Sequence, residues 1–481
     1  MVEQIVVKSA RKHLSIFISY SHFDNAVAIQ LRNNLESAGF NVVEYGRDLA
    51  FSAKIESFND KIVRCDFFIF VVSEQSADSR AVQCELGVAV RQSRANRGYL
   101  PLIIPIYAPN AGRRADGSRI EFFPYLESAD SSFSEAYPLA LVRGWDNFQN
   151  PSIDSYENLI NQLLPKLYIS NYNFDDESFF YETGVFDLYN DLFPGREQDN
   201  PRDIVRWVLN EDIGAVRDIE LCPGRILTYS LDSRYCILSL AGRAVGLGFF
   251  TLEKKNNLVF GNYIAIQEHW RAGELAKSFL KAAIAEFQKI YGKFNGFVFE
   301  VELFDKYEIE RIIQYLERQK EEFPGPNRKK LEFMDEKDSI EIRKFLRVYW
   351  YESIGCRFFM DRDSNTPLES RSPCLDPHAD NWVEGEDKFW IMWKSNDSIS
   401  VHVDDYSLWA QSIESIYIEI LAKSLLEIST KKIEYWNYVN DIVSSILNSV
   451  KPECVCRASY LRRRDEDLFR RWVNLRMPLA I

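Results

Sequence analysis

The sequence predicts an α/β protein in which a parallel sheet with helices on both faces precedes a mixed α+β unit and a helical C-terminal region. Three observations support this prediction. Short, almost wholly apolar runs alternate with amphipathic stretches near the N-terminus, as in buried parallel strands and their covering helices. Three strand-like runs then follow one another with tight turns. Beyond residue 400, apolar residues recur at helical spacing.

Composition limits the classes of function. The chain has 481 residues, of which 46% are hydrophobic and 27% are charged, which is enough for several cores. A net charge of -13 argues against nucleic acid as a partner. The eight cysteines form no CxxC pair, so we expect reduced thiols and no metal. Without a signal peptide or a run of about 20 apolar residues, we expect a cytoplasmic protein and no membrane association.

The first unit contains four candidate parallel strands, at residues 14–19, 40–45, 66–72 and 99–108. Asp24 is placed to cap the first helix, and Gly39 to end it. Parallel sheets bind ligands beyond the carboxyl ends of their strands. The polar residues that follow the first and third strands should therefore line one crevice: Tyr20, Ser21 and His22, and Ser73 to Ser76.

Glu85 stands out on the helix after the third strand. At about 100° per residue, it falls near the middle of an apolar side made of Ala81, Val82, Leu86, Val88 and Ala89. Burying an unpaired carboxylate is costly. The residue therefore either pairs with an arginine, lies at the sheet edge, or has a chemical function.

Three motifs in order resemble those of a Toll/interleukin-1 receptor (TIR) domain. "FISYSHFD" resembles its first box, "GRDLAFSA" its BB loop, and "FVVSEQSADSRAVQCELGVA" the stretch with the catalytic glutamate of NAD-cleaving members. The resemblance implies a flavodoxin-like TIR domain over residues 12–168, with Glu85 as the catalytic residue. One position departs, because Ala81 stands where the family often has tryptophan.

The TIR resemblance also implies a substrate and a partner. NAD is the expected substrate, cleaved to ADP-ribose by water or to a cyclic product by an internal nucleophile. The implied NAD-binding residues are Tyr20, Ser21, His22, Asp48, Phe51, Ser76 and Ala81. Self-association is expected because the BB loop (residues 46–53) of one copy helps complete the site of its neighbour. A noncatalytic TIR scaffold remains the alternative.

The middle unit, residues 178–400, resembles a GNAT-type N-acetyltransferase. A meander over residues 235–266 leads into "FGNYIAIQEHWRAGELAKSFLKAAI", which resembles the acetyl-CoA motif, and "VYWYESIGCRFF" resembles the later tyrosine motif. Glu274 replaces the middle glycine of the acetyl-CoA motif. The unit is therefore either an active acetyltransferase or a GNAT-like fold kept as a ligand sensor or assembly platform. The implied acetyl-CoA region comprises Ile264, Ile266, Arg271, Gly273, Ala276 and Tyr351.

Residues 401–481 are predicted to form packing helices. Together these features predict a TIR NAD+ glycohydrolase or ADP-ribosyl cyclase that a GNAT-like sensor regulates. By family analogy it acts in antiviral defence, in response to a trigger or partner protein that the sequence does not identify. Its alternatives are the noncatalytic scaffold and an acetyltransferase that is recruited through its TIR domain.

Overall fold

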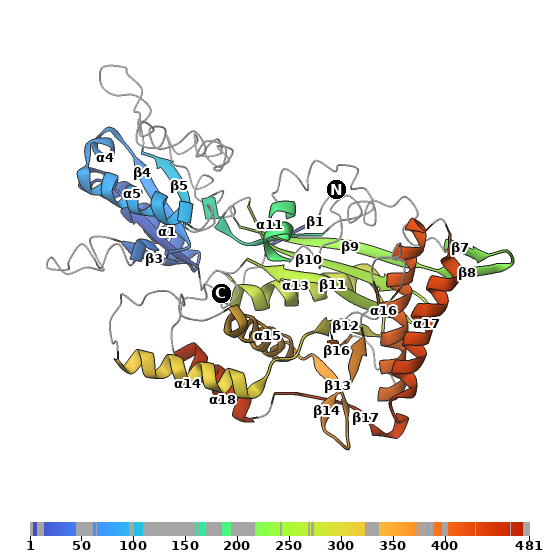
Figure 1. The fold of residues 1–481 in the computed structure, drawn as a ribbon. Coiled ribbons are helices and arrows are strands. Elements are labelled where there is room, and N and C mark those ends of the chain that lie inside the picture. The colour runs from blue at the N-terminus through green and yellow to red at the C-terminus, as the bar shows by residue number, and fades with distance from the viewer. Residues whose placement is uncertain are drawn as a thin grey trace.

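A computed structural model of the chain confirms the predicted fold class, with an N-terminal parallel sheet and then a mixed sheet with helices (Figure 1). The structure describes residues 3–6, 14–44, 61–63, 65–95, 101–108, 159–160, 163–169, 185–193, 217–240, 243–267, 270, 274–322, 336–371, 373–374, 382, 388–396, 403–428, 430–461 and 463–474.

The N-terminal sheet has the strand order β3-β2-β4-β5, and all its pairs are parallel. Its strands are β2 (Ser15–Ser19), β3 (Asn41–Glu44), β4 (Phe67–Val72) and β5 (Leu102–Tyr107). β4 is buried along its whole length, as its apolar sequence predicts. The helical elements are η2 (His22–Asp24), α1 (Asn25–Ser37), α4 (Glu74–Asp78) and α5 (Arg80–Ala95).

The two longer helices cover opposite faces of this sheet, because neighbouring strand residues point to opposite sides. Ile16 and Ile18 share a core with α1, whereas Phe17 of the same strand packs in the core that holds Leu86 of α5. α5 therefore crosses the central strands, with its first turn near the ends of β2 and β4.

The second unit is built on a sheet with the order β1-β6-β9-β10-β11-β12-β16-β13-β14. β9 (Leu231–Leu240), β10 (Arg243–Glu253) and β11 (Leu258–Ile266) form the predicted antiparallel meander. β12 (Gly296–Val301) is parallel to β11. The remaining strands on this side are β13 (Arg357–Asp361), β14 (Thr366–Pro367), β15 (Glu369–Arg371), β16 (Lys388–Ser395) and β17 (Val455–Ala458).

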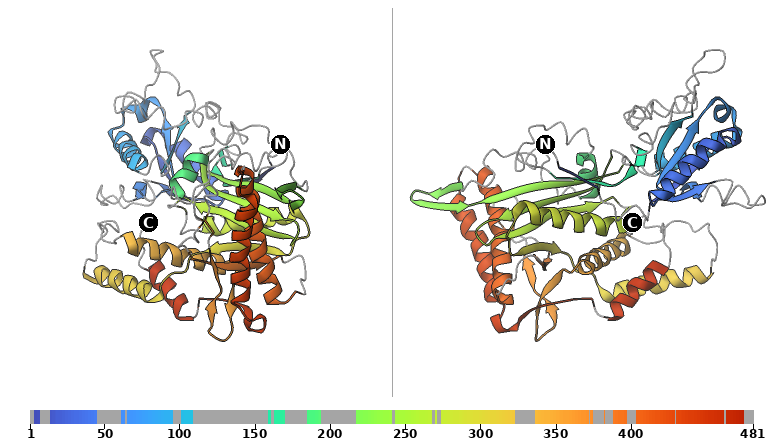
Figure 2. Two further views of the ribbon diagram at one scale, coloured as in Figure 1. Left: turned by 45° about the vertical axis from the view of Figure 1, so that its right-hand side comes forward. Right: turned by 180° about the vertical axis from the view of Figure 1, so that it is seen from behind.

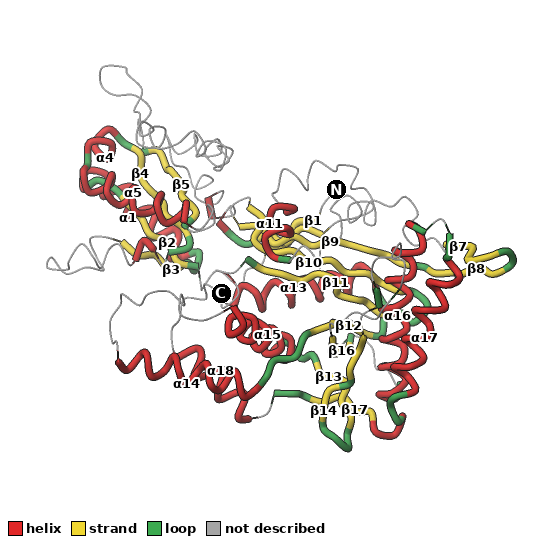
Figure 3. The backbone as a smooth tube through the Cα atoms, viewed as in Figure 1, coloured by secondary structure: helices red, strands yellow, loops and turns green. Residues whose placement is uncertain are grey.

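Helices cover both faces of the large sheet. On one face, α13 (Glu274–Tyr291) and α15 (Glu336–Ser353) share a core with Phe250 and Phe299. On the other, α16 (Asp405–Glu427) and α17 (Lys432–Asn448) run side by side and pack on Val298 and Trp393 (Figure 3). α11 (Val185–Leu192), η6 (Pro452–Cys454) and α18 (Arg463–Asn474) complete the described helical elements. None of the helices that the structure describes is long and apolar enough to cross a membrane.

The parallel strands β11 and β12 part after a short pairing. Residues 258–261 pair with residues 296–299, yet β11 continues to Ile266. The structure thus opens the sheet between these two strands, near the start of α13.

Two strands that flank the N-terminal sheet in sequence belong to the large sheet. β1 (Glu3–Val6) pairs with β6 (Lys166–Ile169), which in turn pairs with β9. The apolar spacing of "SYENLINQLLPKL" (residues 155–167) predicts an amphipathic helix. Residues 159, 160 and 163 are helical, but the predicted end of the helix is wrong, because Leu167 and Ile169 alternate into the core as strand residues. The predicted domain boundaries stay a prediction.

A hairpin that the sequence analysis did not predict extends beyond the large sheet. Its strands are β7 (Arg217–Cys222) and β8 (Arg225–Tyr229), and it packs against α17. The Arg225 guanidinium lies 4.0 Å from the ring centroid of Trp436, a cation–π contact that fixes the hairpin to the helix. The hairpin and the N-terminal sheet lie at opposite ends of the molecule (Figure 2).

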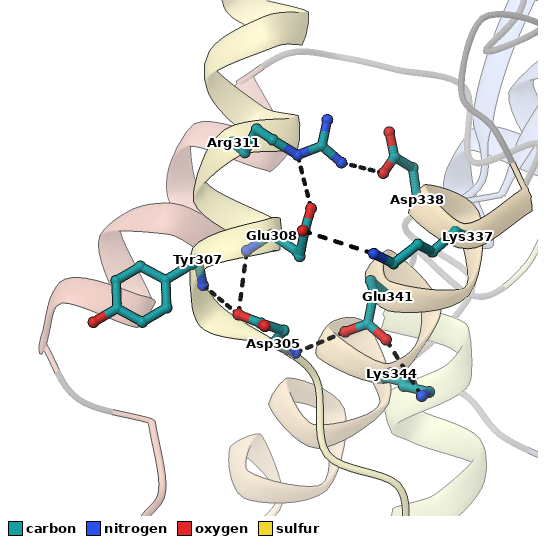
Figure 4. A network of polar contacts seen from close by, with 8 residues as sticks. All are labelled: Asp305, Tyr307, Glu308, Arg311, Lys337, Asp338, Glu341 and Lys344. Atoms are coloured by element: carbon teal, nitrogen blue, oxygen red, sulfur yellow. Dashed lines mark hydrogen bonds and ion pairs between the residues drawn. The ribbon is translucent and has the colours of Figure 1, made fainter.

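A polar network joins α14 (Lys306–Glu322) to α15 (Figure 4). Asp305 caps α14 by accepting from the Tyr307 amide at 2.8 Å, and its own amide donates to Glu341 at 2.7 Å. Arg311 bridges Glu308 of its own helix and Asp338 of α15. Because Arg311 is largely exposed, each of its ion pairs contributes little to stability. The two hydrogen bonds of Asp305 therefore do more to hold the start of α14 against α15.

Candidate active site

Glu85 and Ser19 meet at the carboxyl end of the parallel sheet. Ser19 is the last residue of β2, and its side chain is only 1% exposed. Its hydroxyl donates a hydrogen bond of 2.6 Å to Oε2 of Glu85 on α5. The alternative that the sequence left open, an arginine partner, is not seen for Glu85 among the described residues.

The surroundings of Glu85 favour the neutral, protonated form of its carboxyl. Burial raises the pKa of this carboxyl from 4.5 to about 7, and the hydrogen bond from Ser19 opposes the rise. A carboxyl with a pKa near the working pH can serve as a charged stabiliser or as a proton acceptor. Strong shifts of this kind are typical of functional sites, although structural groups also show them.

The apolar side of α5 differs in one detail from the sequence prediction. Val82, Leu86 and Ala89 are buried, but Ala81 is exposed and Val88 is half-buried. Glu85 therefore lies at the border of the buried side and not at its middle. The buried side of α5 therefore does not include Ala81.

A second buried cluster lies beside this pair, between the ends of β2 and β4. The Ser73 hydroxyl donates to Asp24 at 2.6 Å, and burial raises the pKa of Asp24. Ser73 also caps α4 by accepting from the Ser76 amide at 3.0 Å. The prediction that the Asp24 side chain caps α1 was wrong, because no such bond forms and Ser73 binds the carboxylate instead.

Ser73→Ala should destabilise this part of the N-terminal unit by about 1–2 kcal/mol, because it removes both a helix cap and the donor to a buried carboxyl. Thermal unfolding followed by circular dichroism measures the loss. Ser79→Ala is the matched control, since its hydroxyl is 3.5 Å from the Val82 amide, too long for a strong cap. An equal loss in both variants would show that the Asp24 bond contributes nothing.

The predicted NAD-binding residues differ in how far they are exposed to solvent. Tyr20 is half-buried, Ser21 is buried, and His22 is exposed, with its ring centroid 3.8 Å from that of Phe23. Ser76 is fully buried, and its hydroxyl accepts from the Ser73 amide and donates to the Ser73 carbonyl, so it supports the loop. Asp48 and Phe51 lie outside the described residues.

The predicted acetyl-CoA region is largely apolar where it is described. Ile266 and Ala276 are buried, Ile264 is half-buried, and Arg271 and Gly273 lie outside the described residues. Tyr351 is 5% exposed, stacks on Phe299 with ring centroids 4.9 Å apart, and has its pKa raised by burial. These surroundings are those of a packed aromatic side chain.

Sequence reasoning missed one other buried acidic pair. Glu300 of β12 has its pKa raised to about 7, first by burial and then by the charge of Glu419 on α16. Glu419 is 3% exposed and accepts from Asn262 at 2.7 Å. The signal was present in the sequence, because each acid interrupts an otherwise apolar strand or helix face.

Comparisons with known proteins identify the N-terminal part. No curated protein matches the chain. One matching solved structure is an N-acetylglutamate synthase from Neisseria gonorrhoeae in complex with coenzyme A and N-acetyl-glutamate, with 10% identity, a TM-score of 0.18, and 56% of each chain covered. The present chain thus spans little more than half of that protein, and a likeness this low carries no argument. The TIR domain family model matches residues 16–136. By this match and by its four-stranded parallel sheet, the N-terminal part of the chain is a TIR domain.

Proposed function

We propose that the TIR domain cleaves the nicotinamide–ribosyl bond of NAD, with Glu85 as the catalytic carboxylate. The observation that carries the proposal is the Ser19–Glu85 pair at the ligand-binding end of the sheet, where a half-buried carboxyl is held by a buried donor. The TIR family includes NAD-cleaving enzymes, and the motif position of their glutamate falls on Glu85.

The chemistry needs a carboxylate and little else from the protein. When the bond between the ribose C1′ and the nicotinamide nitrogen breaks, its electron pair leaves with neutral nicotinamide, so no general acid is required. Positive charge builds on the ribose, and an ionised Glu85 beside it stabilises the oxocarbenium-like transition state. Water then attacks C1′ and loses its proton to solvent or to Glu85. Attack by a group within the substrate gives a cyclic product.

The direct test is to incubate the purified full-length chain with NAD and to resolve the products by chromatography. Release of nicotinamide with ADP-ribose or a cyclic isomer is the expected result. A parallel incubation with acetyl-CoA and amine acceptors tests the acetyltransferase alternative. A chain that leaves NAD intact, with and without infected-cell lysate, contradicts the proposed activity.

Regulation by the second unit is part of the same proposal. The strands β1 and β6 pair within the large sheet and stand before and after the N-terminal sheet in the sequence. A ligand that moves the large sheet therefore acts on the segments at both ends of the TIR domain. By family analogy the response is to viral infection, with NAD loss or a nucleotide signal as the output.

Activity should rise with protein concentration, because we expect the BB loop (residues 46–53) of one copy to complete the site of another. Specific activity measured over a hundredfold range of protein concentration, with light scattering during turnover, checks this expectation. Constant activity per chain in a strictly monomeric sample would rule out a shared site.

A noncatalytic TIR scaffold is the second candidate. It is favoured by the exposed Ala81, at a position where the family often has tryptophan, and by Phe23, which is 72% exposed at the same end of the sheet. An exposed aromatic there suits a protein contact as well as a ligand. The NAD incubation separates the two candidates, since the scaffold self-associates but releases no nicotinamide.

A further inference from the structure

Ser19 is held more rigidly than the carboxylate that it binds. It ends β2, a central strand that pairs with β3 on one side and β4 on the other, and it lies opposite Phe70 in the ladder. At 1% exposure its hydroxyl has no access to bulk water. The donor is therefore fixed by the sheet, whereas Glu85 reaches it from α5 by a flexible side chain.

We propose that Ser19 is a positioning residue for Glu85, whose hydroxyl holds Oε2 so that Oε1 faces the ribose, and that this bond sets the lowest pH at which the site works. The inference rests on the proposed function of Glu85. It adds a residue that touches neither NAD nor the bond that breaks.

The direction of the pH effect follows from the two causes of the shift. Burial raises the pKa of Glu85 to about 7, and the Ser19 hydrogen bond lowers it. Removing the hydroxyl leaves only the cause that raises the pKa, so the ionised form then requires a higher pH. Among the side chains that the structure describes, the other titratable groups next to Ser19 or on η2, α4 and α5 are Tyr20, His22, Asp24, Glu74, Asp78, Arg80, Cys84 and Arg91. None of these is among the causes of the Glu85 shift.

The same strand supplies a matched control. Ser15 begins β2, and its hydroxyl donates to the half-buried Asp66 carboxylate at 3.0 Å. Ser15 and Ser19 thus make the same kind of bond at opposite ends of one strand. Ser15→Ala should lower the stability of the fold and leave the protonation of Glu85 unchanged. Ser19→Ala should raise the pH at which Glu85 ionises.

The experiment measures kcat/KM for NAD cleavage by the full chain from pH 5 to 9. In Ser19→Ala, the acid limb of the profile, where kcat/KM rises with pH, should shift to higher pH by roughly one unit. At pH 7 this shift lowers kcat/KM about fivefold, and at pH 9 most of that loss is recovered. Ser19→Cys keeps the side-chain volume but donates weakly, so its limb should lie between those of the wild type and Ser19→Ala. Ser15→Ala should keep the wild-type limb. A Ser19→Ala limb that coincides with that of the wild type, or an equal shift in Ser15→Ala, overturns the inference.

A second measurement keeps this inference separate from the proposed function. In the full chain labelled with carboxyl-13C glutamate, the Glu85 resonance is assigned as the one lost in Glu85→Gln and is titrated without NAD. A higher midpoint in Ser19→Ala than in the wild type supports the positioning role even if the wild type cleaves no NAD. Equal midpoints overturn it even if NAD is cleaved.

Discussion

Glu85→Gln is expected to lower NAD cleavage by at least about 100-fold, the scale on which enzymes lose rate when one key electrostatic group is removed. The amide keeps the size of the carboxyl, and its oxygen can still accept the hydrogen bond that Ser19 now donates at 2.6 Å. The fold should therefore survive while the negative charge beside the ribose is lost. Initial rates of nicotinamide release at pH 7 and 9 measure the effect.

The control for this variant is Glu74→Gln, which neutralises a carboxylate in the first turn of the adjacent helix α4. It should retain activity within about twofold, because it loses only a weak helix-dipole interaction. Wild-type rates in Glu85→Gln would remove Glu85 from the chemistry and favour the scaffold. Equal losses in both variants would point to general electrostatics of the unit and not to Glu85 itself.

Gly296→Ala is expected to destabilise the second unit by about 3 kcal/mol, because an added Cβ has nowhere to go. It would lie 2.5 Å from Cζ2 of Trp393 and 2.6 Å from the Lys394 carbonyl oxygen. Trp393 is 2% exposed, and Lys394 belongs to β16, which pairs with β12 along this ladder. Neither neighbour can withdraw without breaking packing or strand pairing.

Urea unfolding followed by circular dichroism measures this loss. Gly87→Ala is the control, since its Cβ would meet nothing nearer than the Arg91 guanidinium at 3.6 Å. Within the helix α5 it should raise stability by roughly 0.5–1 kcal/mol. Unfolding of Gly296→Ala at the wild-type urea midpoint would mean that β12 and β16 can move apart at little cost.

Apolar patterning predicts those elements whose surroundings are uniform along their length. The β4 run is apolar throughout because both faces of a central parallel strand are covered, and the prediction was confirmed. The β9–β11 meander was confirmed as well, because turn residues separate its strands. In both regions the local signal is enough to place the strands, although β9 begins at Leu231 and not at the predicted Tyr235.

Elements whose stability comes from distant segments were not predicted. β1 has only four residues, and it is a strand because β6 lies beside it, far away in the sequence. The β7–β8 hairpin depends on α17, which follows it by about two hundred residues. Such pairings leave no periodic pattern within a short window.

The sequence predicted the carboxylate of the candidate site, Glu85, but not the residue that donates a hydrogen bond to it, Ser19. Glu85 was conspicuous because a carboxylate interrupts an apolar side of a helix. Ser19 was one polar residue at the end of a strand, and many serines occupy such places without a partner. Likewise, the sequence predicted Asp24 as a cap, and only the approach of β4 to β2 brings Ser73 to it.

The placement of β1 and β6 has a consequence for how the chain can be divided. Val6 and Lys166 are direct partners in an antiparallel ladder, so in topological terms the entire TIR domain is the loop of a β-hairpin. Residues that stand opposite each other in this way are about 5 Å apart, a span that a two-residue turn closes. A shortened chain with Asn-Gly in place of residues 7–165 would therefore keep every strand of the large sheet. Cutting the chain once, after Ile169, would instead remove two strands and leave β9 as an unprotected edge that invites aggregation.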